Sequence, residues 1–554
     1  MIASNMKSKN GSAAIRSFEG LNRQPKSTIG EFSDMENMTH RDYPALSSVK
    51  GCTTEVTAPE GVEFIKYIIP KFADFDPTKF SGIAKETDGT YSIYVNGEKK
   101  RGGINEFIDA VDFGGAIITV PEFLGYNYVT KGAYSSTSAY VGPFRRSTTK
   151  YIAHFGETND EAKEQTIYVE SFPTFFGGIE LGECIAISGC TDFAEENNTW
   201  YPENSLDYSK KNPVVVKVIS LASDSGVLRV AVYNAEGKMT CFPRHEVSKN
   251  GITVTTLFPQ ISHICVHKNR LWATSKSGEF IYASALGKPL EFYKLNSLAT
   301  SSWYGGVGTP GKFTGIVSWN NRVIAFKRNS MNIVYGNSPL DFSIEKSYYV
   351  GCIDKNSISV VGNSVMWLGG DGFYIFSGGL PSRVSDKLKG SFTSCRAFSH
   401  EGKYYAECEN GDKTEFLVYD TEKGLWSKLK TEGILGGDCD GKNIYLWNSS
   451  SVKKMFSGSF GDFYAETVPM YFDTFDNQAV INLNIRCIMK DNSFLNIYTE
   501  TDGNESAAHK GISKSGKSKI PIRYKSGDFL IIRFEGSGEV CITDMEMEFT
   551  TEKA

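Results

Sequence analysis

The sequence predicts an all-β chain built around a β-propeller of about six or seven blades. Between residues 264 and 460 a short pattern recurs: two or three β-branched or aromatic residues, a tight polar turn, then another apolar pair. Successive copies start 52, 43, 37 and 41 residues apart. Aromatic residues make up 13% of the chain and glycines number 54, a composition that favours strands joined by turns. Repeats of this length with several short strands are typical of propeller blades.

Each copy of the pattern predicts a β-hairpin, because Asn or Gly stands where the turn needs a positive φ. One such sheet cannot bury both of its faces, whereas radial packing against its neighbours buries them and leaves only short edges. A long β-sandwich with coincidental internal similarity is the alternative interpretation. The five copies are Cys265–Trp272, Val317–Ile324, Val360–Trp367, Ala397–Tyr405 and Asp438–Trp447.

The rest of the chain is interpreted as pieces attached to this row of hairpins. A polar stretch with scattered apolar anchors opens the chain, and a run of short strands with a small-barrel appearance interrupts the blades. The last segment alternates apolar and polar residues with period two, which predicts an antiparallel sandwich, with a polar loop from Asp502 to Ser518. The predicted divisions are an extended N-terminal arm (1–56), the first propeller blades (57–132), an inserted β domain (133–259), the remaining blades (260–460) and a C-terminal β-sandwich (461–554).

Composition narrows the classes of function. A length of 554 residues predicts about three or four domains. The net charge of −5 argues against a protein that grips nucleic acid, although a mildly acidic wall would let DNA slide past. No apolar run is long enough for a membrane helix, and the N-terminus has no apolar core for a signal peptide, so we expect folding in a reducing cytoplasm. The 11 scattered cysteines are then expected to be thiols.

No catalytic, cofactor-binding or metal-binding residue is predicted, and the chain is not expected to be an enzyme. Residues 511–518 match the phosphate-loop pattern GxxxxGKS, but Pro521 stands where the helix should begin, so a lysine-rich hairpin tip is the better interpretation. His263 and His267 are the closest pair of histidines, and no cysteine or carboxylate completes a zinc site at a known spacing.

A propeller glycosidase would need two carboxylates in the central funnel. The Ser-x-Asp-x-Gly-x-Thr-Trp box of sialidase-like propellers is absent, and the Gly-His and Trp-Asp dipeptides of WD40 repeats are absent too. Asp371-Gly372 and Asp440-Gly441 stand in predicted hairpin turns, where Asp-Gly is expected for backbone reasons alone. A glycan-binding propeller that meets a host surface is left open, because Tyr and Trp serve both cores and sugar platforms.

Several short motifs resemble structural proteins of bacteriophage tails and necks, in particular the packaged-DNA stabilisation and tail-nozzle propeller proteins of short-tailed phages. The similarity covers most of the chain. The motifs are Phe18-Glu-Gly-Leu-Asn22, Gly30 to Thr39 followed by Tyr43-Pro44, Phe176 to Thr191 with Asn197-Asn198, Arg270 to Pro289, Gly351-Cys352, Asp371 to Tyr374, and Arg533 to Gly538.

This resemblance implies a structural virion protein in the phage tail, assembled in the host cytoplasm. It implies a ring of copies of the chain, usually sixfold, that continues the passage for the genome without reading its sequence. It also implies docking of neighbouring tail or neck proteins such as an adaptor and fibres, with no stable insertion into a membrane. The arm 1–56 is expected to be pinned to a surface, its own or a neighbour's, and the hypothesis is that it reaches over an adjacent subunit. The insertion 133–259 is the expected docking surface.

Overall fold

The computed structural model confirms the predicted fold class: the chain is all-β and consists of many small antiparallel sheets of the propeller type. Among the residues that the structure describes, the one helical element is a single turn of 3-10 helix at Lys355–Ser357. The described residues are 9–68, 76, 78–121, 125–128, 153–159, 164–170, 181–182, 184–188, 214–222, 226–231, 253–256, 259–295, 298–431, 433–472, 477–522 and 526–552.

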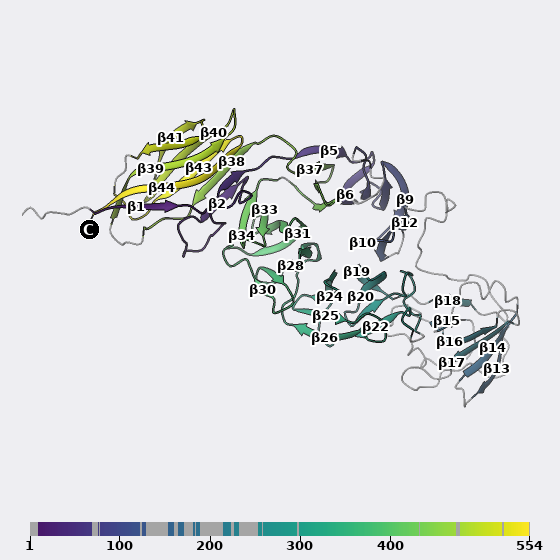
Figure 1. The fold of residues 1–554 in the computed structure, drawn as a ribbon. Coiled ribbons are helices and arrows are strands. Elements are labelled where there is room, and N and C mark those ends of the chain that lie inside the picture. The colour runs from purple at the N-terminus through teal and green to yellow at the C-terminus, as the bar shows by residue number, and fades with distance from the viewer. Residues whose placement is uncertain are drawn as a thin grey trace, which may run out of the picture. The chain divides into compact units, whose positions relative to one another are not determined.

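Seven small sheets occur in the described part of the chain (Figure 1). In each of them the strands that are neighbours in the sequence pair as an up-and-down meander, and the last sheet also contains β5 from the beginning of the chain. The sheets are β6 (Val62–Ile68), β7 (Gly82–Glu86), β8 (Tyr91–Val95), β9 (Glu98–Ile104); β10 (Phe107–Phe113), β11 (Ala116–Pro121), β12 (Gly125–Asn127); β19 (Ile261–His267), β20 (Arg270–Ser275), β21 (Phe280–Ala283), β22 (Trp303–Gly306); β23 (Phe313–Trp319), β24 (Arg322–Lys327), β25 (Ser330–Tyr335), β26 (Ser343–Tyr348); β27 (Ser359–Val361), β28 (Ser364–Leu368), β29 (Phe373–Phe376), β30 (Ser382–Arg383); β31 (Phe392–His400), β32 (Lys403–Asn410), β33 (Lys413–Asp420), β34 (Leu425–Leu429); and β35 (Gly436–Cys439), β36 (Ile444–Trp447), β37 (Ser451–Lys454) with β5 (Thr53–Thr57).

All five predicted hairpins are present, and their turns have the expected backbone. They join β19 to β20, β23 to β24, β27 to β28, β31 to β32 and β35 to β36. Lys268 and Asn269 in the first turn both have positive φ, at 48° and 54°, and Asn320 and Asn321 in the second have φ of 41° and 65°. Two consecutive positive φ angles give the turn the twist that matches the flanking strands.

The last of the seven sheets is completed by a strand from the beginning of the chain. β5 pairs antiparallel with β37, with Val56 opposite Val452. A propeller needs such a non-local strand when its chain closes on itself, because the final blade would otherwise expose an unpaired edge.

Contact clustering divides the chain into two compact units. One comprises Met1–Asp88, Tyr94–Lys99 and Asn356–Ala554, and the other comprises Gly89–Ile93 and Lys100–Lys355. In the first unit β27 lies beside β31, β31 beside β35, and β35 beside β6; in the second, β10 lies beside β19 and β19 beside β23. Within each unit, therefore, successive sheets meet through their first strands, as blades do around an axis.

The hydrophobic core is a set of layers between neighbouring sheets. In the second unit Trp272 of β20 packs with Val323 of β24. In the first unit Phe398 of β31 packs with Leu446 of β36, and the next layer joins Trp447 to Ile65 of β6. Both faces of these short sheets are buried, which explains the continuous apolar runs in their central strands.

Between the sheet of β12 and the sheet of β19 the chain forms one further antiparallel sheet. Its strands lie within residues 133–259, where an inserted β domain with a small-barrel appearance is predicted, and in the described residues they form a single open sheet. One strand, at residues 153–159, was not expected from the sequence. In spatial order it holds β13 (Ala153–Asn159), β14 (Glu164–Val169), β17 (Val227–Ala231), β16 (Val214–Ala222), β15 (Cys184–Ser188) and β18 (Thr253–Thr256).

The C-terminal segment forms two sheets with alternating buried and exposed residues, as predicted for a sandwich. In β43, for example, Ile532 and Phe534 are fully buried and their neighbours partly exposed. One sheet has the order β3 (Met38–Thr39), β4 (Leu46–Ser48), β44 (Val540–Glu552), β39 (Asn477–Met489), β42 (Gly516–Pro521), with β1 (Lys9–Ile15) also on β44; the other has β2 (Phe32–Glu36), β38 (Asp462–Thr467), β43 (Ile531–Ser537), β40 (Phe494–Thr501), β41 (Asn504–Ile512).

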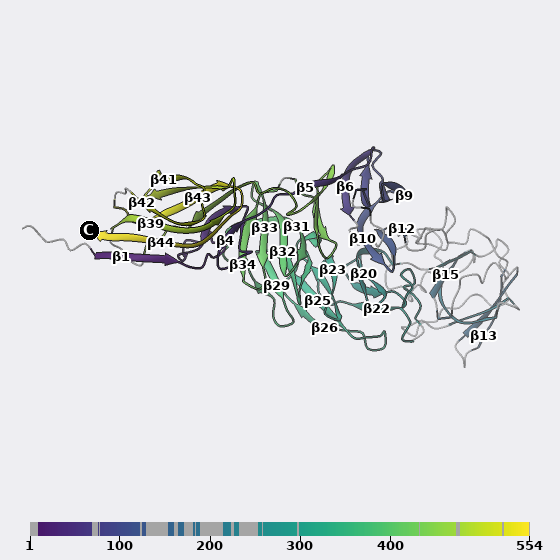
Figure 2. The same ribbon diagram turned by 45° about the horizontal axis from the view of Figure 1, so that its top comes forward.

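The N-terminal segment, predicted as an extended arm pinned to a surface of its own chain or of a neighbour, forms strands on its own chain in the described residues. β1 pairs along β44 from Lys9 opposite Thr551 to Ile15 opposite Met545, and both views show the two strands side by side (Figures 1 and 2). β2 to β4 complete the two sheets of the sandwich, and β5 completes the last small sheet. The described part of 1–56 therefore lies on its own chain, because the sandwich edges offer it backbone partners and apolar pockets.

The predicted polar loop from Asp502 to Ser518 is wrong, because β41 and β42 occupy most of it. β41 is exposed along almost its whole length, so it lacks the apolar alternation by which strands are recognised. The phosphate-loop match at 511–518 covers the end of β41, the turn after it and the start of β42. The interpretation of this stretch as a hairpin tip is wrong, because β41 and β42 lie in different sheets of the sandwich. Among the described residues no helix is long and apolar enough to cross a membrane.

Candidate functional site

The N-terminal motif residues lie at a junction where residues 18–50 contact both β34 of the sixth sheet and β38 of the sandwich. β2 pairs with β38, and β2 and β3 lie against β34. All of these strands belong to the first unit. We call this region the N-terminal junction.

The Phe18–Asn22 motif seats the chain directly on the backbone of β34. Phe18 and Leu21 are fully buried, and the Leu21 N–H donates to the carbonyl of Trp426 at 2.9 Å. A Cβ placed on Gly20 would lie 2.7 Å from the Trp426 carbonyl oxygen and 2.8 Å from its nitrogen. Only glycine permits this approach, because the opposing atoms are backbone and cannot turn aside.

The second motif contributes a buried acid that closes the loop between Asn22 and Gly30. Glu31 is 3% exposed; its carboxylate accepts hydrogen bonds from the Asn22 amide at 2.7 Å and the Thr28 N–H at 2.6 Å, and it pairs with Lys387 at 2.8 Å. Burial opposes ionisation, but these donors, Lys387 foremost, lower the pKa of Glu31 below its usual value. The loop is thereby held in one conformation.

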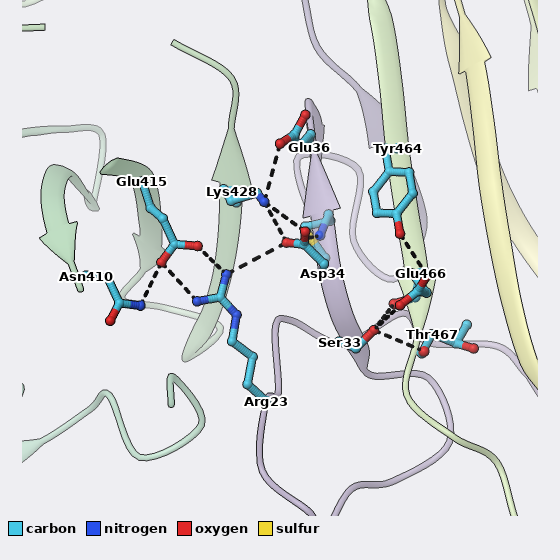
Figure 3. A network of polar contacts seen from close by, with 11 residues as sticks. Arg23, Ser33, Asp34, Glu36, Asn410, Glu415, Lys428, Tyr464, Glu466 and Thr467 are labelled. Atoms are coloured by element: carbon cyan, nitrogen blue, oxygen red, sulfur yellow. Dashed lines mark hydrogen bonds and ion pairs between the residues drawn. The ribbon is translucent and has the colours of Figure 1, made fainter. Parts of the chain in front are cut away.

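A network of ion pairs joins the N-terminal segment to the sixth sheet (Figure 3). The Arg23 guanidinium donates to both oxygens of Glu415, at 2.6 and 3.0 Å, and lies 3.7 Å from Asp34. Lys428 of β34 bridges Asp34 at 2.7 Å, and the Asn410 amide donates to Glu415 at 3.0 Å. A bidentate ion pair between two mostly buried side chains fixes both the distance between Arg23 and Glu415 and their relative orientation.

Strand β2, which carries Asp34, is anchored to the sandwich on its other side (Figure 3). The Ser33 hydroxyl donates to Glu466 at 3.0 Å, and the Tyr464 hydroxyl donates to the second oxygen of Glu466 at 2.8 Å. β2 is thus held by backbone pairing on β38 and by side-chain ion pairs on the sixth sheet. The junction ties the sixth sheet and the sandwich through one short segment.

A cavity of about 610 Å³ opens beside the junction, among the N-terminal segment and the sixth and seventh sheets. This volume lies in the range of small-molecule sites. Its lining combines apolar side chains with an excess of cations. The lining residues are Thr39, His40, Arg41, Val49, Lys50, His400, Glu401, Lys403, Tyr405, Val418, Asp420, Leu425, Ser427, Leu429, Lys442, Asn443, Ile444, Lys454, Met455, Phe456 and Ser457.

His40 forms part of the cavity wall as a neutral imidazole. Its Nε2 donates to the carbonyl of Glu19 at 2.7 Å, which leaves Nδ1 as an acceptor. Burial lowers the pKa of His40 to about 4, with nearby Asp420 only partly opposing the shift. Asp420 itself pairs with Lys423 at 3.0 Å, so one of the two acids of the lining is already neutralised.

The candidate residues weighed from the sequence do not come together into a reactive site. His267 hydrogen-bonds the Ser318 hydroxyl at 2.8 Å, and burial lowers the pKa of His263 to about 4. In the described part of the chain no three metal-ligating side chains cluster. Asp371 pairs with Arg383, and Asp440 accepts backbone N–H groups of its own turn. Of the 176–191 motif only 181–182 and 184–188 are described, and Asn197 and Asn198 lie outside the described residues.

The cavity was not predicted from the sequence. Its walls come from residues 39–50 and 400–457. No local pattern in the sequence indicates that these two stretches meet in the fold. The N-terminal motifs were noticed, but their role as a junction depends on strands more than 350 positions away.

Comparisons with known proteins do not assign the chain to a family. No family model matches it, and no curated protein matches it. Solved structures with some similarity include an exo-β-1,3-galactanase from Phanerochaete chrysosporium (9% identity, 52% of this chain and 96% of that chain, TM-score 0.23) and apo AztD from Citrobacter koseri (11%, 70% and 98%, TM-score 0.26). The AfRom2 CNH domain is similar at 11% identity, over 69% of this chain and 96% of that one, with a TM-score of 0.25. Similarity at this level carries no functional inference.

Proposed function

We propose that the chain is a structural subunit of a bacteriophage tail or neck, forming a ring that continues the passage for the genome and docks neighbouring tail proteins. The observation that supports this most is the N-terminal junction. Two of the motifs through which the sequence resembles phage tail proteins, Phe18–Asn22 and Gly30–Thr39, contact both the sixth sheet and the sandwich at this junction.

A rigid junction suits a part that transmits force and position. Small sheets packed through apolar layers form a stiff body, and the junction adds backbone pairing and a bidentate ion pair between two parts of it. A subunit of a closed ring must present the same two surfaces to its neighbours in every copy. Internal flexibility would therefore make assembly of the ring less favourable. The net charge of −5 suits a wall past which DNA slides without sticking.

The test is the assembly state of the full-length protein. Native mass spectrometry and negative-stain electron microscopy should show a single closed assembly of several copies with a central opening, sixfold if the resemblance holds in detail. A protein that stays monomeric at every concentration tested, and that binds glycans on an array as a monomer, would contradict the ring and favour a glycan-binding module.

A further inference from the structure

We propose that the cavity beside the N-terminal junction is a binding site for a small organic anion, a phosphorylated or carboxylated molecule of sugar size. The inference does not depend on the proposed tail role. It rests on two features of the cavity: lysines without ion-pair partners and apolar walls.

Four lysines of the cavity lack an ion-pair partner. Lys50, Lys403, Lys442 and Lys454 line the cavity, and none of these four forms an ion pair with the described residues. Lys50 lies over the Phe460 ring, 5.8 Å from its centroid. Arg41 also lines the cavity but pairs with Asp42 at 3.2 Å, so four unpaired lysines stand against the carboxylates of Glu401 and Asp420, in a chain whose net charge is −5. A local excess of cations in a hollow, low-dielectric setting raises the concentration of anions there.

The walls favour an organic ligand over a free ion. Val418, Leu429, Ile444 and Met455 form apolar surface in the same cavity, and Phe456 completes it. A carbon skeleton would cover this apolar surface while its anionic groups contact the lysines of the lining. Small-molecule sites usually combine apolar walls with a few polar groups in this way. Inorganic phosphate would leave the apolar surface uncovered.

The test is isothermal titration calorimetry of the full-length protein with glucose 6-phosphate, glucuronate, glucose and inorganic phosphate at low ionic strength. We expect saturable binding of at least one of the two anionic sugars, which also identifies whether phosphate or carboxylate is preferred, and weaker binding as salt is added. Glucose and inorganic phosphate should bind at least tenfold more weakly.

Variants locate the binding. Lys403→Met and Lys442→Met should each weaken the preferred anion about tenfold, the loss expected for one charge-assisted hydrogen bond. The control is Lys413→Met, at the start of β33 and outside the cavity lining, which should bind as the parent does. No saturable binding of either anionic sugar, equal binding of glucose or inorganic phosphate, or equal losses in control and cavity variants would each overturn the proposal. Ring assembly is measured separately, so either result stands without the other.

Discussion

The two sides of the N-terminal segment use charge in opposite ways. On the side of Arg23, each cation is matched by a carboxylate within hydrogen-bond reach, and the network is closed. On the side of the cavity, Lys50 of the same segment and three lysines of the sixth and seventh sheets have no ion-pair partners in the described chain. Paired charges of the first kind hold parts of a protein together, whereas unpaired charges around a hollow are available to something else.

The largest loss of stability is expected at Gly20, where the junction leaves no space for a side chain. Gly20→Ala would push a methyl group into the backbone of Trp426, and relief requires the whole segment to lift from β34. We expect a loss of roughly 3 kcal/mol in the free energy of unfolding, measured by urea titration with tryptophan fluorescence. Gly461→Ala is the matched control, because a Cβ there meets nothing within 4 Å. Equal midpoints for the two variants would show that the segment is not seated as described.

The next largest loss of stability is expected when one partner is removed from the ion-pair network around Arg23. Glu415→Gln keeps the shape but leaves Arg23, 18% exposed, facing an uncharged amide. We expect about 2 kcal/mol of destabilisation, since an incompletely solvated cation is left with the weaker help of Asp34. Lys490→Met, which removes an exposed pair with Glu539, should change stability by less than about 0.5 kcal/mol. If the two losses were alike, the network at Arg23 would be no more than a surface contact.

Local features of the fold could be predicted from the sequence, and long-range ones could not. The hairpins were recognised because their turns carry their own signal, such as Asn320-Asn321 with two positive φ angles. The pairing of β1 with β44 leaves no such signal, because Lys9 and Thr551 meet across almost the whole chain. Strand β41 was missed because its exposed polar residues show no alternation.

The candidate site shows the same division. The motif around Gly20 was noticed as a motif, but the reason for the glycine is the backbone of Trp426, which only the structure supplies. The cavity has no sequence signature, since single lysines such as Lys50 and Lys442 are ordinary surface residues until the fold gathers them around one hollow.

A loss of stability of intermediate size is expected when the pH is lowered, because His40 is buried in its neutral form. Its pKa is about 4 in the folded chain, below the ordinary value of 6.5, so between these values the unfolded state binds the extra proton. The stability that depends on neutral His40 is complete above pH 6.5 and is lost as the pH falls toward 4. His40→Gln, which can still donate to the Glu19 carbonyl, should flatten this decline in urea midpoints measured from pH 7 to pH 4. His509→Gln, at an exposed position of β41, should retain the parent slope; a parent slope in His40→Gln would exclude His40 as its source.

The smallest effect on stability is expected in the cavity, and it separates the two sides of the segment most sharply. Lys403→Met combined with Lys442→Met removes two cations that have no ion-pair partner in the described chain and relieves their mutual repulsion. The free energy of unfolding should stay within about 0.5 kcal/mol of the parent, as is usual for substitutions that break no contact. Glu415→Gln removes one charge and Lys403→Met with Lys442→Met removes two, so a larger loss in the double variant would contradict the distinction between structural and available charge. If the double variant keeps its stability but loses anion binding, the lysines serve a ligand and not the fold.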